Sequence, residues 1–403
     1  MRQELEKALH FDNNTATYLN EDGTKTVYVS SVPIEPEKMQ VRQKGDTYQS
    51  TGSRVSVTMP KQLSPEKGIA IGEYLEVFPM QAVDTPARHM DRANAFGIVA
   101  PCVVYENFFG ALPLYCYPNS FGINMEIVIP KRTGNHIFSL QLKQPPDYFS
   151  EIEPDYIDFR NEVDLQSMVY TPIAVDAKGA WSYQNRIVLA TGEDGKMIVH
   201  FVIDKAFLDD PNTQYPVVLN QSIYAYQHKQ PDTAIYSQAG QYARHYLSPY
   251  LLLGEKTPKG EGMALLRFEV LDDLDASAED VLKAEYCFTN LVEQEKNVIV
   301  GAYAITNDWC SVNTKWKSKP NYDALPVGTV MVREKGVYGL DITRLLREML
   351  QNRGKYEPLY SVRNSFLIKS NSKEEKTSLL LAAGDAGFCP PYLKVILKNK
   401  KEK

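Results

Sequence analysis

The sequence predicts an all-β protein whose strands form sandwich-like layers. Segments in which apolar and polar residues alternate run through most of the 403 residues, for example residues 54–58, 125–129 and 136–142. Turn residues separate such segments about every ten positions, as in β-sandwiches and barrels. Because alternate side chains of a strand point to opposite sides, this pattern buries one side of each strand in a core.

Two pairs of segments are predicted to form hairpins. Residues 18–19 and 27–29 flank a Glu-Asp-Gly-Thr turn, and residues 186–189 and 197–203 flank a Gly-Glu-Asp-Gly turn. Glycine and aspartate suit tight turns because they tolerate the backbone angles that such turns require. The all-β prediction therefore depends on local turns as well as on alternation.

One segment departs from the β pattern. Its apolar residues recur at the 3.6-residue spacing of a helix and are Ile342, Leu345, Leu346, Met349 and Leu350. Asp341 precedes them and belongs to a residue type that caps helix N-termini. We therefore predict one helix that packs its apolar stripe against a sheet.

Composition argues against several classes of protein. The formal net charge is −6, whereas nucleic-acid binding favours a basic surface. No run approaches the roughly 18 apolar residues of a membrane-spanning helix, and the first 14 residues contain no apolar segment of a secretory signal. The five cysteines have no Cys-x-x-Cys spacing, so we expect small buried thiols rather than a disulfide framework or a zinc site.

Seven short motifs follow one another in the C-terminal part of the chain. They are Asp232-Thr233-Ala234-Ile235, Leu251-Leu252-Leu253-Gly254, Leu265 to Phe268, Thr306-Asn307-Asp308-Trp309 with Thr314-Lys315-Trp316 and Pro320, Asp341-Ile342-Thr343, Phe366-Leu367-Ile368-Lys369, and Pro391-Tyr392-Leu393-Lys394-Val395. In this order they resemble the DNRLRE-domain family, also called disaggregatase-related modules, although the hexapeptide that names the family does not occur. The resemblance implies a jelly-roll module over residues 226–403, with the predicted helix on its flank.

Four further motifs precede this part of the chain. They are a Tyr-x-Asn-x-Phe motif at 105–109, an apolar strand at 124–129, an Asp-Ala-x-Gly turn at 176–179 and a Tyr-Pro-Val strand at 215–217. This segment is similar to the front of RHS-repeat and wall-associated proteins, although the RHS repeats themselves do not occur in the chain. We expect residues 1–225 to form an irregular β-sandwich-like region that ends at a polar, glutamine-rich stretch.

These resemblances imply a non-catalytic binding or structural protein of a bacterial cell surface or extracellular assembly. The expected partner is a polysaccharide or another cell-envelope polymer, bound without a cofactor. A second hypothesis is an architectural part of a phage-like or toxin-delivery assembly, which would contact other subunits of that assembly. The second hypothesis is motivated by the absence of a visible signal peptide, since such parts leave the cell without one.

Aromatic residues are the candidate ligand contacts, because exposed rings stack on the apolar faces of sugars. The candidates are Tyr242, Tyr246, Tyr250, Tyr322, Trp309 and Trp316. The two tryptophans belong to the family signature, and we expect them in the core. The three tyrosines spaced four residues apart would form a platform in a loop, whereas in a strand they would share a face and pack.

An acidic cluster is the candidate site for a structural calcium ion, which binds six to eight oxygen atoms. The candidate ligands are Asp272, Asp273, Asp275 and Asp385. The spacing lacks the glycine and the terminal glutamate of an EF-hand loop. The favoured alternative is an acidic turn without a metal ion.

Catalytic motifs are not found in the sequence: GxSxG, HExxH, the P-loop and GxGxxG do not occur. A polysaccharide lyase or hydrolase is the third hypothesis. Glycoside hydrolysis requires two carboxylates roughly 5–10 Å apart on either side of the sugar. Glu151, Glu153, Asp155 and Asp158 are candidates, and we expect their proline-rich segment, residues 144–156, to be an exposed loop.

Overall fold

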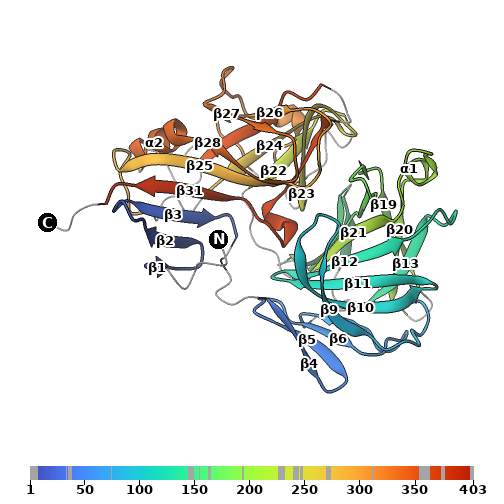
Figure 1. Ribbon diagram of the computed structural model, residues 1–403. Coiled ribbons are helices and arrows are strands. Elements are labelled where there is room, and N and C mark those ends of the chain that lie inside the picture. The colour runs from blue at the N-terminus through green and yellow to red at the C-terminus, as the bar shows by residue number, and fades with distance from the viewer. Residues whose placement is uncertain are drawn as a thin grey trace. The chain divides into compact units, whose positions relative to one another are not determined.

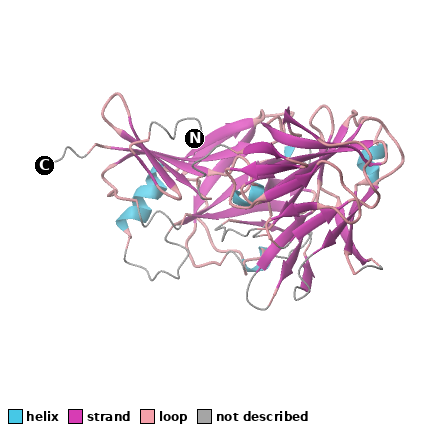
Figure 2. Cartoon of the chain, turned by 90° about the horizontal axis from the view of Figure 1, so that it is seen from below, coloured by secondary structure: helices cyan, strands magenta, loops and turns pink. Residues whose placement is uncertain are grey.

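A computed structural model divides the chain into two compact units. We call Glu37–Gln227 the middle unit, and Met1–Pro36 together with His228–Lys403 the terminal unit. The structure describes residues 8–32, 34, 39–73, 75–143, 149–153, 155–161, 165–192, 195–225, 232–238, 245, 248–268, 274–310, 313–353, 364–373 and 377–399. Strands make up most of them and the helices are few and short (Figure 2). The all-β prediction is confirmed.

The middle unit contains two antiparallel sheets, of ten and eight strands among the described residues (Figure 1). Its elements are β4 (Gln40–Lys44), β5 (Thr47–Thr51), β6 (Val57–Pro60), β7 (Ile69–Ile71), β8 (Leu75–Phe78), β9 (Arg88–Ala93), β10 (Val99–Phe109), β11 (Leu112–Asn119), β12 (Gly122–Ile129), β13 (Ile137–Lys143), β14 (Phe149–Ile152), β15 (Tyr156–Arg160), β16 (Leu165–Tyr170), β17 (Ile173–Val175), β18 (Trp181–Ser182), β19 (Arg186–Thr191), β20 (Met197–Val202), α1 (Lys205–Asp209) and β21 (Val217–Tyr224).

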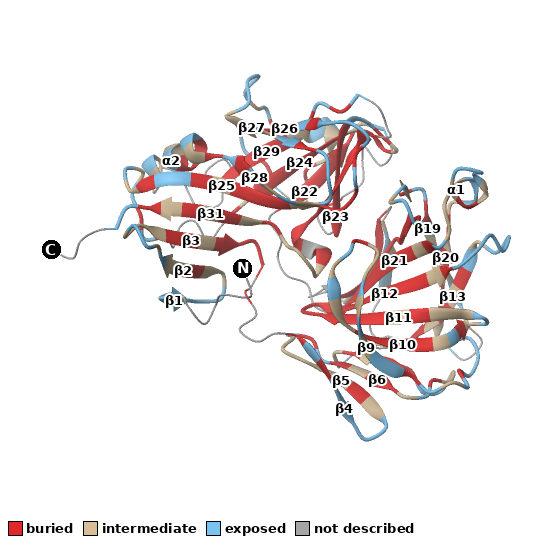
Figure 3. Cartoon of the chain, viewed as in Figure 1, coloured by how far each residue is buried: buried red, intermediate tan, exposed pale blue. Residues whose placement is uncertain are grey.

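The core of the middle unit lies between its two sheets. Met125 and Ile127 of the ten-stranded sheet belong to one buried cluster with Phe138 and Leu140 of the eight-stranded sheet. Figure 3 shows this burial as red bands along the strands. The predicted hairpin at residues 186–203 is present as β19 paired with β20. Local alternation therefore predicts which side of these strands faces the core.

The terminal unit contains the remaining thirteen strands of the described residues, and all of them join in one continuous network of pairings. Its elements are β1 (His10–Phe11), β2 (Thr15–Leu19), β3 (Lys25–Ser30), β22 (Thr233–Tyr236), β23 (Tyr250–Thr257), β24 (Gly260–Arg267), β25 (Val281–Asn290), β26 (Val298–Ala304), β27 (Gly328–Val332), β28 (Gly336–Asp341), α2 (Thr343–Gln351), β29 (Ser365–Ser370), β30 (Leu379–Ala382) and β31 (Tyr392–Leu397).

The beginning and the end of the chain share one sheet. Strand β3 pairs with β31 over its whole length, from Lys25 opposite Leu397 to Ser30 opposite Tyr392. The first hairpin, predicted around residues 18–29, is present as β2 paired with β3. However, it belongs to the terminal unit and not to the region of residues 1–225 in which the sequence placed it. The physical reason is that β31 would otherwise present an unpaired edge, which the hairpin covers.

The predicted helix is α2, and it packs on β25. Its buried side chains are Leu345, Leu346 and Met349. The N-cap position is Ile342 rather than Asp341, although the Asp341 carboxylate still accepts the Thr343 N–H at 2.8 Å. No helix in the described part of the chain is long and apolar enough to cross a membrane.

Only some of the cysteines match the prediction of small buried thiols. Cys102, Cys116 and Cys287 are buried, and burial raises the pKa of all three thiols. Cys310 is exposed and Cys389 is half-buried. The buried three lie on strands β10, β11 and β25, where alternation sets their orientation, whereas the other two lie in connecting segments.

The pairing of β3 with β31 predicts which unit a mutation in β3 destabilises. Replacing Trp181 by Phe leaves Trp309 and Trp316 as fluorescent reporters of the terminal unit. In this background, Val29→Ala should lower the unfolding free energy of the terminal unit by about 1–3 kcal/mol, because Val29 is fully buried. Urea unfolding followed by tryptophan fluorescence measures the change.

A matched control is Val57→Ala, which removes the same atoms from a fully buried site of the middle unit. It should leave the transition of the terminal unit in place. The assignment of the hairpin to the terminal unit would be wrong if Val29→Ala left that transition unchanged.

Candidate functional site

In the terminal unit, the connection from β26 to β27 covers one side of the sheet formed by β22, β24, β29 and β26. Ile235, Met263, Leu265 and Leu367 point to this side and are buried. Trp309, in the connection, belongs to the same buried cluster and is 6% exposed. The sheet therefore has a core on this side that is built by a loop rather than by a second sheet.

Trp309 also fixes the connection by a hydrogen bond. Its indole Nε1 donates to Ser365 Oγ on β29 at 3.0 Å. The base of the connection is closed by the Thr306 N–H, which donates to the Asn321 carbonyl at 2.9 Å. A buried indole N–H needs such a partner, so both contacts favour one position of the loop on the sheet.

Three aromatic side chains surround this cluster and remain half-buried. They are Tyr303 on β26, Trp316 in a short 3-10 turn (Trp316–Ser318), and Tyr322 beyond that turn. The rings of Tyr303 and Tyr322 pack edge to face with centroids 5.7 Å apart. We call these three residues, together with Lys319 and Lys369, the aromatic face.

The two lysines hold their ammonium groups over the aromatic rings. Lys369 Nζ lies 4.9 Å from the centroid of Tyr303 and 5.1 Å from that of Tyr322. Lys319 Nζ lies 4.2 Å from the centroid of Trp316. Among the described residues, neither ammonium group has a carboxylate within ion-pairing distance. Lys369 Nζ also donates to the Tyr322 hydroxyl at 3.5 Å, so the two charges lie beside aromatic rings and a hydroxyl rather than beside an acid.

This arrangement can bind a ligand that has both apolar and anionic parts. Half-exposed tyrosine and tryptophan rings offer flat apolar surface with polar edges, which matches the C–H faces and the hydroxyl rims of sugars. A lysine ammonium has three donors for a carboxylate, sulfate or phosphate oxygen.

The aromatic candidates from the sequence have different fates. Both tryptophans were expected in the core, and Trp309 lies there, whereas Trp316 is half-buried in the aromatic face with Tyr322 because its 3-10 turn lies at the edge of the buried cluster. Tyr250 is 2% exposed on β23, so it packs in the interior and is not available to a ligand. Tyr242 and Tyr246 lie outside the described residues.

Tyr303, Lys319 and Lys369 are the residues of the aromatic face that sequence reasoning missed. Lys369 is the last residue of a family motif, and Tyr303 follows the apolar strand at 298–300. Lys369 lies in β29 opposite Gly301 of β26, two residues before Tyr303. A signal was available in residues 313–322, which contain three lysines, an indole and a tyrosine but no acid.

The calcium candidates do not form a site among the described residues, where no group of three potential ligands is found. Asp272 and Asp273 lie outside the described residues, and Asp275 is exposed in the segment before β25. Asp385 lies in the 3-10 turn Gly384–Ala386, but its side chain is outside the described set. A structural calcium ion thus remains an expectation from the sequence.

The 3-10 turn is instead held by a buried carboxylate from the start of the family motifs. Asp232 Oδ2 accepts the Gly384 N–H at 3.0 Å. Asp232 is 4% exposed, and burial raises the pKa of its carboxyl to about 6 in spite of this hydrogen bond. The first motif and the loop before the last one therefore meet in space.

The carboxylates considered for hydrolysis lie in an edge hairpin. Residues 149–152 form β14, so the described part of the acidic segment includes a strand as well as a loop. Glu151 lies opposite Asp158 on β15, and Arg160 makes ion pairs with both. Asp158 is fully buried, and burial raises the pKa of its carboxyl although Arg160 opposes this. An arginine held by both acids indicates a structural ion pair.

A second acidic group of the middle unit is also engaged internally. Glu126 on β12 is fully buried and pairs with the Arg92 guanidinium at 2.8 Å. Its other oxygen accepts the Asn220 amide at 3.0 Å, and Arg92 lies over the Tyr115 ring at 4.0 Å. A buried charge with this many partners stabilises one arrangement of the strands and is not free to act on a ligand.

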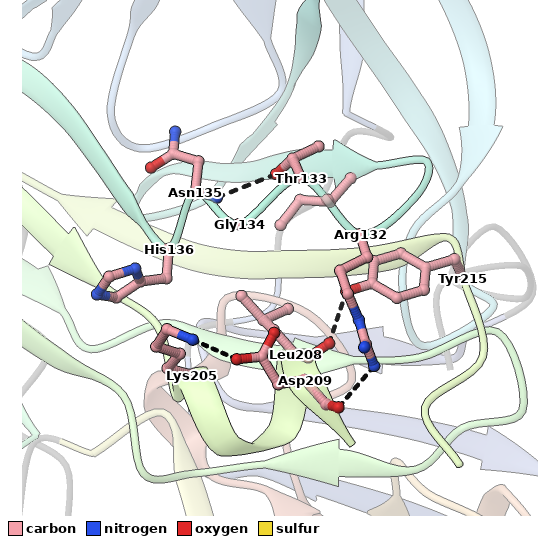
Figure 4. Close-up of a pocket in the computed structure, with 10 residues that line it drawn as sticks. Arg132, Thr133, Gly134, Asn135, His136, Lys205, Leu208, Asp209 and Tyr215 are labelled. Atoms are coloured by element: carbon pink, nitrogen blue, oxygen red, sulfur yellow. Dashed lines mark hydrogen bonds and ion pairs between the residues drawn. The ribbon is translucent and has the colours of Figure 1, made fainter. Parts of the chain in front are cut away.

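A hollow beside helix α1 is too small to be a ligand site. Figure 4 shows Arg132, His136, Lys205 and Tyr215 around it, with Lys205 paired to Asp209. Arg132 Nη2 donates to the Asp209 carbonyl at 2.6 Å, so two of its cations are already engaged. The hollow has room for about one water molecule.

Comparisons with known proteins do not identify the chain. No protein-family model matches it, and no curated protein matches it. The aromatic face therefore has to be interpreted from its own geometry.

Asp232 predicts a pH dependence of stability. Because its folded-state pKa is raised from 3.8 to about 6, the folded protein holds this proton more tightly than the unfolded chain. The stability from protonated Asp232 is complete below about pH 4 and is lost as the pH rises through 6. Between pH 4 and 7, the wild type should lose about 2–3 kcal/mol of unfolding free energy relative to Asp232→Asn.

Urea unfolding of both proteins at several pH values measures this difference, and groups other than Asp232 cancel in the subtraction. Asn keeps an oxygen that can accept the Gly384 N–H, so the variant is expected to fold. A difference that stays constant from pH 4 to 7 would show that Asp232 titrates normally.

Proposed function

We propose that the chain is a non-catalytic glycan-binding protein and that the aromatic face of its terminal unit is the binding surface. The observation that carries the proposal is that Tyr303, Trp316 and Tyr322 lie half-buried around one apolar cluster. The Lys319 ammonium lies over the Trp316 ring, and the Lys369 ammonium lies over the rings of Tyr303 and Tyr322. Aromatic rings held firmly at a surface are the usual means by which proteins bind flat apolar faces of sugars.

The lysines favour a glycan that carries anionic groups. The protein has a net charge of −6, so a general attraction for anions is not expected from its composition. The positive charges at the aromatic face are local, and those of Lys319 and Lys369 face no carboxylate among the described residues. A uronate, sulfate or phosphate on the glycan would supply the missing counter-charge.

The arginine-paired carboxylates of the middle unit support binding rather than turnover. Catalysis of glycoside cleavage needs carboxylates or a base at the sugar, whereas Glu126, Glu151 and Asp158 are engaged by arginine in the other unit. The expected location is the one implied by the resemblance, a bacterial cell surface or an extracellular assembly. A binding module that recognises an envelope polymer fits both points.

Substitutions in the aromatic face should weaken binding to polymers while leaving the fold intact. We expect Tyr322→Ala to lower the affinity for an acidic polysaccharide at least about tenfold, which corresponds to about 1.4 kcal/mol. Lys369→Met, which keeps the apolar stem, should lower the affinity and reduce its dependence on salt. Affinity electrophoresis against neutral glucans and uronate polymers, followed by calorimetry, measures both effects.

Matched controls lie on other strands of the same unit. Tyr28→Ala removes a half-buried tyrosine of β3, and Lys394→Met removes a half-buried lysine of β31. Both should bind polymers like the wild type, with thermal unfolding reporting any general loss of stability. The proposal fails if no polymer binds the wild-type protein, or if the control and site variants weaken binding equally.

A further inference from the structure

The sheet surface next to the aromatic face is apolar and exposed, and it continues that face along strand β26. Residues 299, 301 and 303 of β26 point to the same side because alternate residues of a strand do. Ile299 is 42% exposed, and Met331, directly opposite on β27, is 58% exposed. The connection from β26 to β27 covers the sheet at the Tyr303 end and leaves this pair open.

Gly301 joins the two ends of this surface. A Cβ atom at Gly301 would lie 3.0 Å from Tyr303 Cε2, 3.1 Å from its hydroxyl and 3.2 Å from Pro326 Cβ. The Tyr303 ring therefore leans back along the strand over Gly301, toward Ile299, and the exposed Pro326 lies beside it. The apolar surface is thus continuous from Tyr303 to Ile299.

The surface has the dimensions of a track for an extended chain. Tyr303 follows Ile299 by four positions, which is about 13 Å along a strand. Tyr322 and Trp316 extend it further at the other end. Lys369 lies opposite Gly301, near the middle of the track, and places its charge between the two apolar ends. A single sugar ring would cover only part of this length.

We infer that the aromatic face and the Ile299–Met331 pair form one elongated site that binds the interior of an anionic polysaccharide chain rather than a terminal sugar. This inference rests on the proposed function. Its occupant is a polymer because the apolar surface is continuous with the rings and the charge recurs beside it. The Tyr303–Tyr322 end with Lys369 holds one part of the chain, and Ile299 with Met331 holds sugars further along.

The experiment is calorimetric titration with a ladder of uronate oligomers, from the disaccharide to the octasaccharide. Wild-type affinity should rise at least about tenfold from the disaccharide to the octasaccharide. The double variant Ile299→Thr with Met331→Thr keeps β-forming residues on an exposed surface, so it should fold normally. The double variant should bind the octasaccharide about as weakly as it binds the disaccharide. Its affinity for the disaccharide should equal that of the wild type.

Val337→Thr is the matched control, since Val337 is 59% exposed on β28, where it lies opposite Thr289 of β25, and it should change nothing. Equal wild-type affinity for all lengths would overturn the inference and leave the proposed function standing. The inference would also be overturned if light scattering showed that the double variant differs from the wild type in oligomeric state, because a second copy of the chain would then use this surface. Absence of binding to any oligomer or polymer would overturn the proposed function and this inference with it.

Discussion

The burial of Trp309 is the interaction on which the candidate site depends. Its indole fills the apolar side of the sheet, and its N–H is satisfied by Ser365. Trp309 anchors the connection from β26 to β27 on the sheet, together with the backbone hydrogen bonds at its base and the packing of Trp316 and Tyr322 against the same cluster. Trp316 and Tyr322 belong to that connection, so their position near Tyr303 depends on how Trp309 packs.

A buried anchor beside exposed rings also separates two roles that look alike in the sequence. Trp309 and Trp316 are seven residues apart and both belong to the motif that resembles the DNRLRE-domain family. Only Trp316 keeps part of its ring at the surface. Burial of Trp309 therefore contributes to folding, whereas the exposed part of the Trp316 ring can contribute to binding. Rings that are held by a core lose little entropy when a ligand stacks on them, which favours affinity.

The elements that the sequence predicts well are local. Alternation identifies β20 and β12, helical spacing identifies α2, and turn residues identify the β2–β3 hairpin. Each of these depends on neighbours within a few positions. The pairing of β3 with β31 could not be predicted in this way. Apolar and polar residues alternate in both strands, but this pattern does not specify which strand each one pairs with. Residues 1–36 were consequently assigned to the wrong side of the boundary near residue 225.

The candidate site could be predicted only in part for the same reason. Trp316 and Tyr322 lie in one stretch of sequence and are recognisable as aromatic residues among lysines. Lys369 is brought to Tyr303 by the register of β29 on β26, which no local pattern specifies. The site therefore depends on both a loop and a sheet. The connection from β26 to β27 supplies residue types that indicate a ligand. The sheet sets the spacing of the contacts, which decides whether the ligand is a single sugar or a chain.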